Sequence, residues 1–182
     1  IRNANNPDII DGAEGFMDVS QGVTPLEGIV GDILGAGHNS GVHEAGNPHY
    51  LLDPIEGIRV AELVTRRLSK MLPDLAVEFA ENLDKFRDPL AKALMGEALA
   101  ERHDVVQIAD MYMAGTLDSF LEQQGHGLAL QGWLGELKEY RGTVIVGDHD
   151  LWPYFSRRIG LSVLGYFEPE PGIPPTTKHL QA

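Results

Sequence analysis

The sequence contains no cysteine among its 182 residues. This absence excludes disulfide bonds, thiolate zinc sites and thiol catalysis. Long apolar runs of about 18 residues are also missing, so we expect no membrane-spanning helix. No signal peptide is visible. Because the sequence begins at Ile1 rather than Met, we expect a processed or trimmed product.

Basic residues are scarce. The chain has 14 Lys and Arg against 27 Asp and Glu, a net charge of −13. This charge repels a phosphate backbone and argues against nucleic-acid binding. Hydrophobic residues make up 43% of the chain, which is typical of a globular protein. The length suits one domain with a real core or two small lobes.

The first fifty residues are rich in Gly, Asn, Asp and Pro, which predicts mostly loop with one or two short strands. A helix is predicted to begin at Asp53. Asp53 can cap it, Pro54 suits its first position, and Glu56 follows three residues after the cap. Pro73 ends or kinks this helix.

A second amphipathic helix is predicted over residues 75–94, where apolar side chains recur every three or four residues. Pro89 interrupts the pattern, so we expect either a kink or a new helix beginning at Asp88 and Pro89. Residues 96–140 predict short helices separated by Gly, typical of a helical subdomain packed on the main body.

The last third predicts a strand, a short helix and a second strand. Thr143–Val146 is a β-branched run that indicates a buried strand, Gly160 stops the helix, and LSVLGYF follows as the second strand. This spacing is typical of a parallel βαβ unit. His149 falls just past the C-terminal end of the first strand, at the sheet edge where ligands bind in open α/β folds.

Histidines concentrate in the stretch HNSGVHEAGNPHYLLDP, which runs from His38 to Pro54. Pro48 stiffens the loop before His49, and a rigid loop suits a metal ligand. The alternative is a histidine on a surface loop. For His149, the alternative is a structural histidine bonded to backbone. Together the two suggest a zinc site assembled from distant loops, although their spacing matches no specific zinc motif.

His43 and Glu44 could add ligands or collect metal loosely, and the alternative is a solvated polar loop. We interpret His38, His103, His126 and His179 as polar surface residues. We expect no enzyme, because the sequence offers no Ser/His/Asp arrangement and no general base. The paired Glu168 and Glu170 belong to a Pro-rich turn.

The stretch GNPHYLLDP (residues 46–54) resembles the NPHxWLDP signature of the zinc- and manganese-binding solute receptors of ABC importers, the ZnuA/TroA-like cluster. TVIVGDHDLWPYFSRRIGLSVLGYFEPEPGIPPTTKHL (residues 143–180) is similar to a long family stretch, above all at GYFEPEPGIPP. The segment GFMDVSQGV and the predicted helices of residues 96–140 resemble the corresponding segments in one branch of this family. The resemblance therefore covers nearly the whole chain, with departures at Leu51, Asp148 and Glu170.

The resemblance implies an α/β, two-lobed solute-binding-protein fold with a bridging helix, here incomplete at both ends. Residues 1–73 would end the first lobe and carry the histidine-rich metal loop. Residues 74–140 would form the bridging helix and a helical insertion. Residues 141–182 would begin the second α/β lobe. The family's two other ligands would lie before Ile1 and after Ala182, so the chain resembles a middle fragment or a shortened member.

By the same resemblance, His49 and His149 would hold the ion from the two lobes, and His43, Glu44 or Asp148 would complete the site. Nitrogen ligands favour zinc, with manganese as the alternative. Neutral imidazole is the binding form, so the site would weaken below about pH 6. The implied partners are the metal ion and ABC permease subunits. The implied location is periplasmic or extracytoplasmic. There a partner protein would attach the chain to a membrane.

Two hypotheses follow. The first is a zinc-preferring solute-binding protein that delivers its ion to an ABC importer. The second is a metal-free structural or interaction subunit of a larger complex that keeps the fold. The second is favoured by the missing ligand segments and by incomplete lobes, whose open sheet edges would need another protein chain to cover them.

Overall fold

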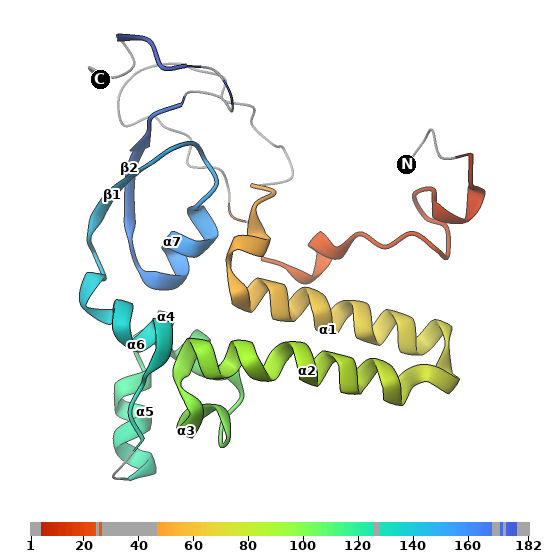
Figure 1. Ribbon diagram of the computed structural model, residues 1–182, viewed down its shortest axis with the longest axis horizontal. Coiled ribbons are helices and arrows are strands. Elements are labelled where there is room, and N and C mark those ends of the chain that lie inside the picture. The colour runs from red at the N-terminus through yellow and green to blue at the C-terminus, as the bar shows by residue number, and fades with distance from the viewer. Residues whose placement is uncertain are drawn as a thin grey trace.

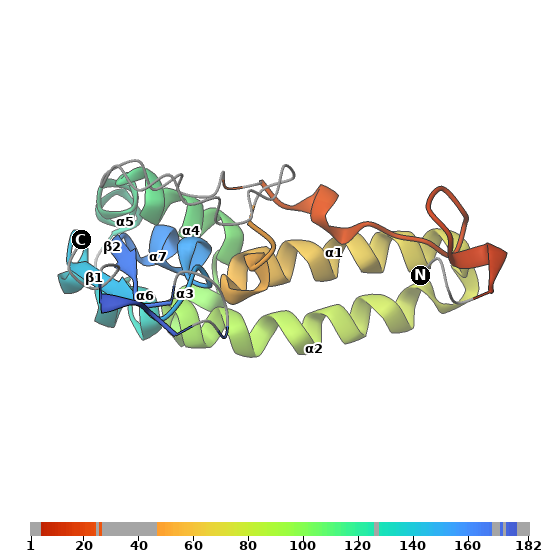
Figure 2. The same cartoon turned by 90° about the horizontal axis from the view of Figure 1, so that it is seen from above.

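The computed structural model describes residues 5–24, 26, 47–125, 128–168, 172 and 174–177. A long helical hairpin, α1 and α2, projects from a body of shorter helices and a small sheet (Figure 1). Seen from above, the hairpin forms one end of an elongated molecule (Figure 2). Among the described helices, none combines the length and the apolar character needed to cross a membrane.

The N-terminal segment lies along α1 (Figures 1 and 2). It contains two short 3-10 helices, Pro7–Ile9 and Val19–Gly22, and residues 5–24 form no strand. The expectation of short strands is therefore wrong for this part. Asn6 and Asp18 each cap a 3-10 helix with a side-chain oxygen, and such local side-chain bonds compete with strand pairing.

Helix α1 spans Pro54–Met71 and begins as predicted. The carboxylate of Asp53 accepts a hydrogen bond from the backbone N–H of Ile55 at 2.9 Å, which caps the helix. A 3-10 turn, Tyr50–Leu52, joins this cap to the loop that carries His49. The cap therefore fixes the point at which the loop enters the helix.

Helix α2 spans Ala76–Met95 after a 3-10 turn at Pro73–Leu75, and it runs back beside α1. Pro89 lies inside α2, which continues as one helix to Met95. Proline removes one backbone donor, but the turn that follows is held by the burial of Ala91, Leu94 and Met95 in the core. Packing therefore outweighs the local cost of Pro89.

The described residues that follow form four short helices, α3 (Glu97–Ala100), α4 (Val105–Ala114), α5 (Leu117–Gln124) and α6 (Gly132–Glu136), with a 3-10 turn at Leu137–Tyr140. The main core of the described residues lies where these helices meet the N-terminal end of α1 and the C-terminal end of α2. Gly132 allows the close approach of α6 to α2, because a Cβ there would lie 2.3 Å from the carbonyl oxygen of Ala93.

The βαβ unit consists of β1 (Val144–Gly147), α7 (Pro153–Ile159) and β2 (Ser162–Tyr166). Its two strands are parallel, as predicted. The prediction of a buried first strand is wrong, since Val144 is 59% exposed and Val146 is 47% exposed. In the described part of the chain the sheet has only these two strands, which leaves their outward side chains uncovered.

Candidate metal site

His49 and His149 lie together although they are far apart in the sequence. Their ring centres are 6.3 Å apart and the ring planes are inclined at 82°. At a tetrahedral zinc ion, two imidazoles bound at about 2.0–2.1 Å have ring centres about 5 Å apart. The two rings lie about 1 Å farther apart than that, near enough for small side-chain rotations to bring both to one ion. Both offer the nitrogen donors that zinc prefers.

The loop before α1 holds His49 through Asn47. Oδ1 of Asn47 accepts the backbone N–H of His49 at 2.9 Å and lies 3.0 Å from Nδ1 of its ring. Asn47 is buried, with 6% of its surface exposed. The buried amide of Asn47 therefore fixes the orientation of the His49 ring from its Nδ1 side.

His149 follows the C-terminal end of β1, as the βαβ prediction requires. Its Nδ1 lies 3.7 Å from Oδ2 of Asp148. Asp148 in turn accepts a hydrogen bond from Nε1 of Trp152 at 3.0 Å. That bond, with the backbone N–H of His149, holds the pKa of Asp148 below its ordinary value. The turn after β1 therefore keeps an ionised carboxylate beside His149.

Tyr166 packs against the end of β1 and shapes this turn. A Cβ at Gly147 would lie 2.8 Å from the Tyr166 ring, so the strand end accommodates only glycine without movement. The Tyr166 hydroxyl donates to Oδ1 of Asp150 at 2.7 Å. Burial and this bond to Asp150 both raise the pKa of Tyr166. Tyr166 therefore stays a neutral donor.

No third His, Asp or Glu gathers with the two histidines in a metal-binding group within the part of the chain that the structure describes. The predicted ligands His43 and Glu44 lie outside the described residues. The residues on either side of their segment are described. The backbone N–H of Asn47 donates to the carbonyl of Leu26 at 3.0 Å, and the N–H of Leu26 donates to the Tyr154 hydroxyl at 3.0 Å.

A buried ion pair joins the start of α1 to α7. Nε of Arg158 donates to both carboxylate oxygens of Asp53, at 2.9 and 3.1 Å. Arg158 is 1% exposed and Asp53 is fully buried. Because Asp53 lies shortly after His49 in the chain and α7 belongs to the βαβ unit that carries His149, this pair fixes the two histidine-bearing segments relative to each other.

Further charges surround this pair. The network contains three carboxylates and three guanidinium groups: Asp53, Glu56, Asp110, Arg59, Arg157 and Arg158. Nη1 of Arg59 donates to Oε1 of Glu56 at 2.8 Å. Burial raises the pKa of Asp53 and of Glu56, against the opposing attraction of the arginines. The balanced charges explain how fully buried carboxylates are tolerated here.

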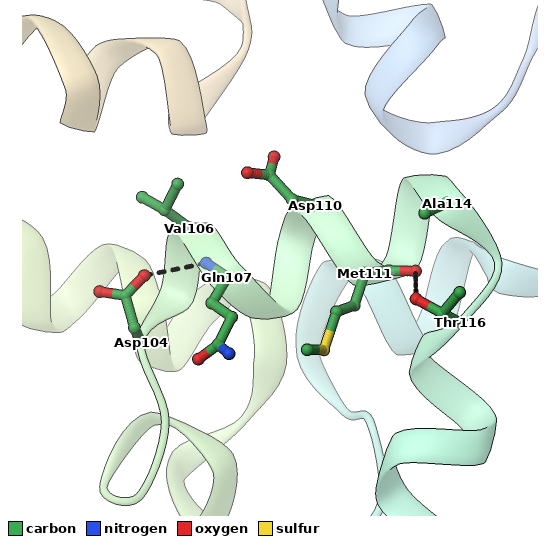
Figure 3. A pocket seen from close by; sticks show the side chains of 7 residues that line it. All are labelled: Asp104, Val106, Gln107, Asp110, Met111, Ala114 and Thr116. Atoms are coloured by element: carbon green, nitrogen blue, oxygen red, sulfur yellow. Dashed lines mark hydrogen bonds between the residues drawn. The ribbon is translucent and has the colours of Figure 1, made fainter.

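Other features lie apart from the two histidines. The ring of His103 packs against Phe120, with ring centres 5.3 Å apart. An open surface pocket of about 540 Å³ lies along α4 (Figure 3). Its polar groups already cap the two ends of that helix: Asp104 accepts the N–H of Gln107, and Thr116 donates to the carbonyl of Met111. The pocket lining is Asp104, Val106, Gln107, Asp110, Met111, Ala114 and Thr116.

The sequence-based prediction missed the residues that support the histidines. The sequence pattern indicates only a stiff loop before His49 and assigns no role to Asn47, Asp150, Tyr166 or Arg158. One local signal was available, because an Asn two residues before a histidine can accept its backbone N–H. The contacts of Asp150 and Arg158 span more than a hundred residues and leave no local signal.

Comparison with solved structures shows the fold. A crystal structure of the Streptococcus pneumoniae AdcAII protein aligns with a TM-score of 0.51 and 16% identity, over 91% of this chain and 44% of that one. A crystal structure of ZnuA aligns with a TM-score of 0.50 and 21% identity, over 91% of this chain and 47% of that one. The chain thus spans less than half of either structure. The expected α/β solute-binding-protein fold, present in part, is confirmed.

Comparison with curated proteins finds no match. The family model of ZnuA, described as zinc-uptake complex component A, periplasmic, matches residues 3–102, more than half of the chain. That family is one of uptake components and not of enzymes, in agreement with the expectation from the sequence. The match includes the loop of His49 and the whole of α1 and α2. The chain belongs to the ZnuA family of periplasmic zinc-uptake components.

Proposed function

We propose that this chain binds a zinc ion between His49 and His149 and is part of a periplasmic solute-binding protein that delivers the ion to an ABC importer. The observation that carries the proposal is the approach of the two rings to 6.3 Å. Family membership supports zinc as the cargo. Two imidazole nitrogens also favour zinc over magnesium or calcium, which prefer oxygen ligands.

The ligand set is completed, in this proposal, by His43 and Glu44. The support comes from the residues that bound their segment, because Leu26 and Asn47 are hydrogen-bonded to each other close to His49. Together with His49 and His149, these two ligands would supply three imidazole nitrogens and one carboxylate, the four ligands of a tetrahedral zinc site. Manganese remains the alternative cargo, and its binding would increase with carboxylate ligands.

The division into lobes is also a proposal. Residues 1–73 would end the first lobe, residues 74–140 would hold the bridging helix and the helical insertion, and residues 141–182 would begin the second lobe. The bounds of α1, of α2 and of the βαβ unit support these limits. In this division the Asp53–Arg158 ion pair joins a residue of the first lobe to a residue of the second.

The test is a competitive zinc titration of the purified chain and of three variants. We expect one zinc per chain in the wild type. In His49→Ala and in His149→Ala the zinc affinity should fall by more than about a hundredfold, because the loss of a ligand costs more affinity than the loss of a residue that only contacts a ligand. His103→Ala is the matched control, because His103 packs on Phe120 and lies outside the site. Equal zinc affinity in all four proteins would contradict the proposal.

The exposed apolar side chains of the strand pair favour a second candidate function, a metal-free interaction subunit. Val144, Val146 and Leu164 in the strands, and Phe167 directly after β2, are each 47–65% exposed. Exposed apolar residues grouped on a small sheet are typical of a surface that another chain covers. A purified complex that contains no zinc, and that binds none when zinc is added, would favour this function over the first.

A further inference from the structure

The polar contacts behind the His49 ring form a chain that runs into the βαβ unit. Asn47 is its central residue. Its Oδ1 faces His49 twice, at 2.9 Å from the backbone N and at 3.0 Å from Nδ1. Its Nδ2 donates to the backbone carbonyl of Asp150 at 3.1 Å and to Oδ2 of Asp150 at 3.0 Å. One buried side chain therefore contacts both segments that carry the histidines.

The neighbours of Asn47 fix the orientation of its amide. The backbone N–H of His49 can only donate, so an oxygen must face it. The carbonyl of Asp150 can only accept, so the NH2 group must face that side. With Oδ1 placed toward His49, Nδ1 of the ring must carry the proton that this oxygen accepts. In the neutral ring, the lone pair that can bind a metal is then on Nε2.

The chain of contacts continues beyond Asp150. Oδ1 of Asp150 accepts the Tyr166 hydroxyl at 2.7 Å, while Oδ2 accepts Asn47. Tyr166 is the last residue of β2 and is paired with Gly147 at the end of β1. Asp150 directly follows His149. The position of Asn47 is thus tied to the strand ends from which His149 extends.

We propose that Asn47 is a positioning residue for the metal site: it holds His49 in the tautomer whose Nε2 is free to bind the ion, and through Asp150 it fixes His49 relative to His149. The inference rests on the proposed function. Polar groups that orient a metal-binding histidine typically contribute about 10–100-fold to metal affinity. A loss of that size is expected when Asn47 is replaced.

The tautomer is tested without metal, by 15N-resolved NMR of the histidine rings at about pH 8, where an ordinary imidazole is neutral. We expect the proton of His49 on Nδ1 in the wild type. In Asn47→Ala this preference should be lost, because the substitution removes Oδ1 of Asn47, the oxygen that accepts the Nδ1 proton of His49. Asn82→Ala is the matched control, an exposed asparagine in the middle of α2, and should leave the His49 signals unchanged.

Asn47→Asp separates the two roles. A carboxylate at this position still accepts from His49, but it can no longer donate to Asp150 and sets two carboxylates against each other. We expect the Nδ1–H tautomer to remain and the zinc affinity to fall by at least about tenfold. Asn47→Ala should lose both the tautomer and the affinity. Far-UV circular dichroism measures the helix content of each variant, so that only folded proteins are compared.

The outcomes distinguish this inference from the proposed function. If zinc binds through both histidines but Asn47→Ala keeps the wild-type tautomer and affinity, the positioning role is overturned and the proposed function stands. A proton found on Nε2 of His49 in the wild type also overturns it. If the tautomer is as expected but the wild type binds no zinc, the proposed function fails, and the positioning role fails with it.

Discussion

Charge and burial oppose each other at Glu56. Its side chain is fully buried, and its Oε2 has no hydrogen-bond partner among the residues that the structure describes. Burial raises its pKa, and the neighbouring negative charge of Asp53 raises it further, against the attraction of Arg59. Glu56 therefore holds its proton to a higher pH in the folded protein than in the unfolded chain.

The first prediction concerns the pH dependence of Glu56→Gln. A raised pKa stabilises the folded state fully below about pH 4.5, the ordinary pKa of this carboxyl, and the stabilisation is lost as the pH rises through the folded value. Urea unfolding should therefore show a larger cost of Glu56→Gln at about pH 4 than at about pH 7. Glu81→Gln, at an exposed position of α2, is the control. A cost that grows toward neutral pH would contradict the assigned direction.

At the residue scale, the sequence predicted that His49 and His149 come together, but not which residues support them. A rigid Asn-Pro-His loop and a residue just after a strand are local features, and both can be recognised in the sequence. The bond between Asn47 and Asp150 joins residues 103 positions apart, so it depends on how the βαβ unit packs against the loop. Local patterns contain no information on such packing.

At the scale of elements, α1 was predictable because its start signal is local. Asp53 and Pro54 occupy the cap and the first helical position, as expected from the sequence. The burial of β1 was not predictable from its composition. A β-branched run indicates a strand, but whether its side chains are covered depends on the neighbours that the strand acquires. Here the described neighbour is β2 alone.

Pro89 limits the stability of helix α2. Pro89 is exposed and lies inside a continuous helix, where it removes one backbone hydrogen-bond donor. We expect Pro89→Ala to raise the free energy of unfolding by about 1–3 kcal/mol. Denaturant unfolding measures the change, with Glu81→Ala as a control expected to stay within about 0.5 kcal/mol. A destabilised Pro89→Ala variant would show that the proline supports the helix instead.

At the scale of the whole molecule, the Asp53–Arg158 pair holds α1 and the βαβ unit together. Asp53→Asn keeps the cap, since Asn is also a good capping residue, but it leaves a buried guanidinium without its carboxylate. We expect the free energy of unfolding to fall by about 3–5 kcal/mol.

Asp104→Asn provides a matched control for this third prediction. Asp104 also caps a helix, α4, and also pairs with an arginine, Arg87, but both side chains are partly exposed. Its replacement should cost no more than about 1 kcal/mol. Equal costs for the two changes in guanidinium unfolding would mean that the buried pair does not tie the two parts of the molecule.

The most direct test of the account is the zinc K-edge absorption spectrum of the chain loaded with one equivalent of zinc. Zinc held by His49, His149 and His43 should show three imidazole nitrogens at about 2.0–2.1 Å from the metal. One imidazole should be lost in His49→Ala and one in His149→Ala, with no change in His103→Ala. A shell made only of oxygen, or a spectrum that is the same in all four proteins, would contradict the claim that these two histidines hold the ion.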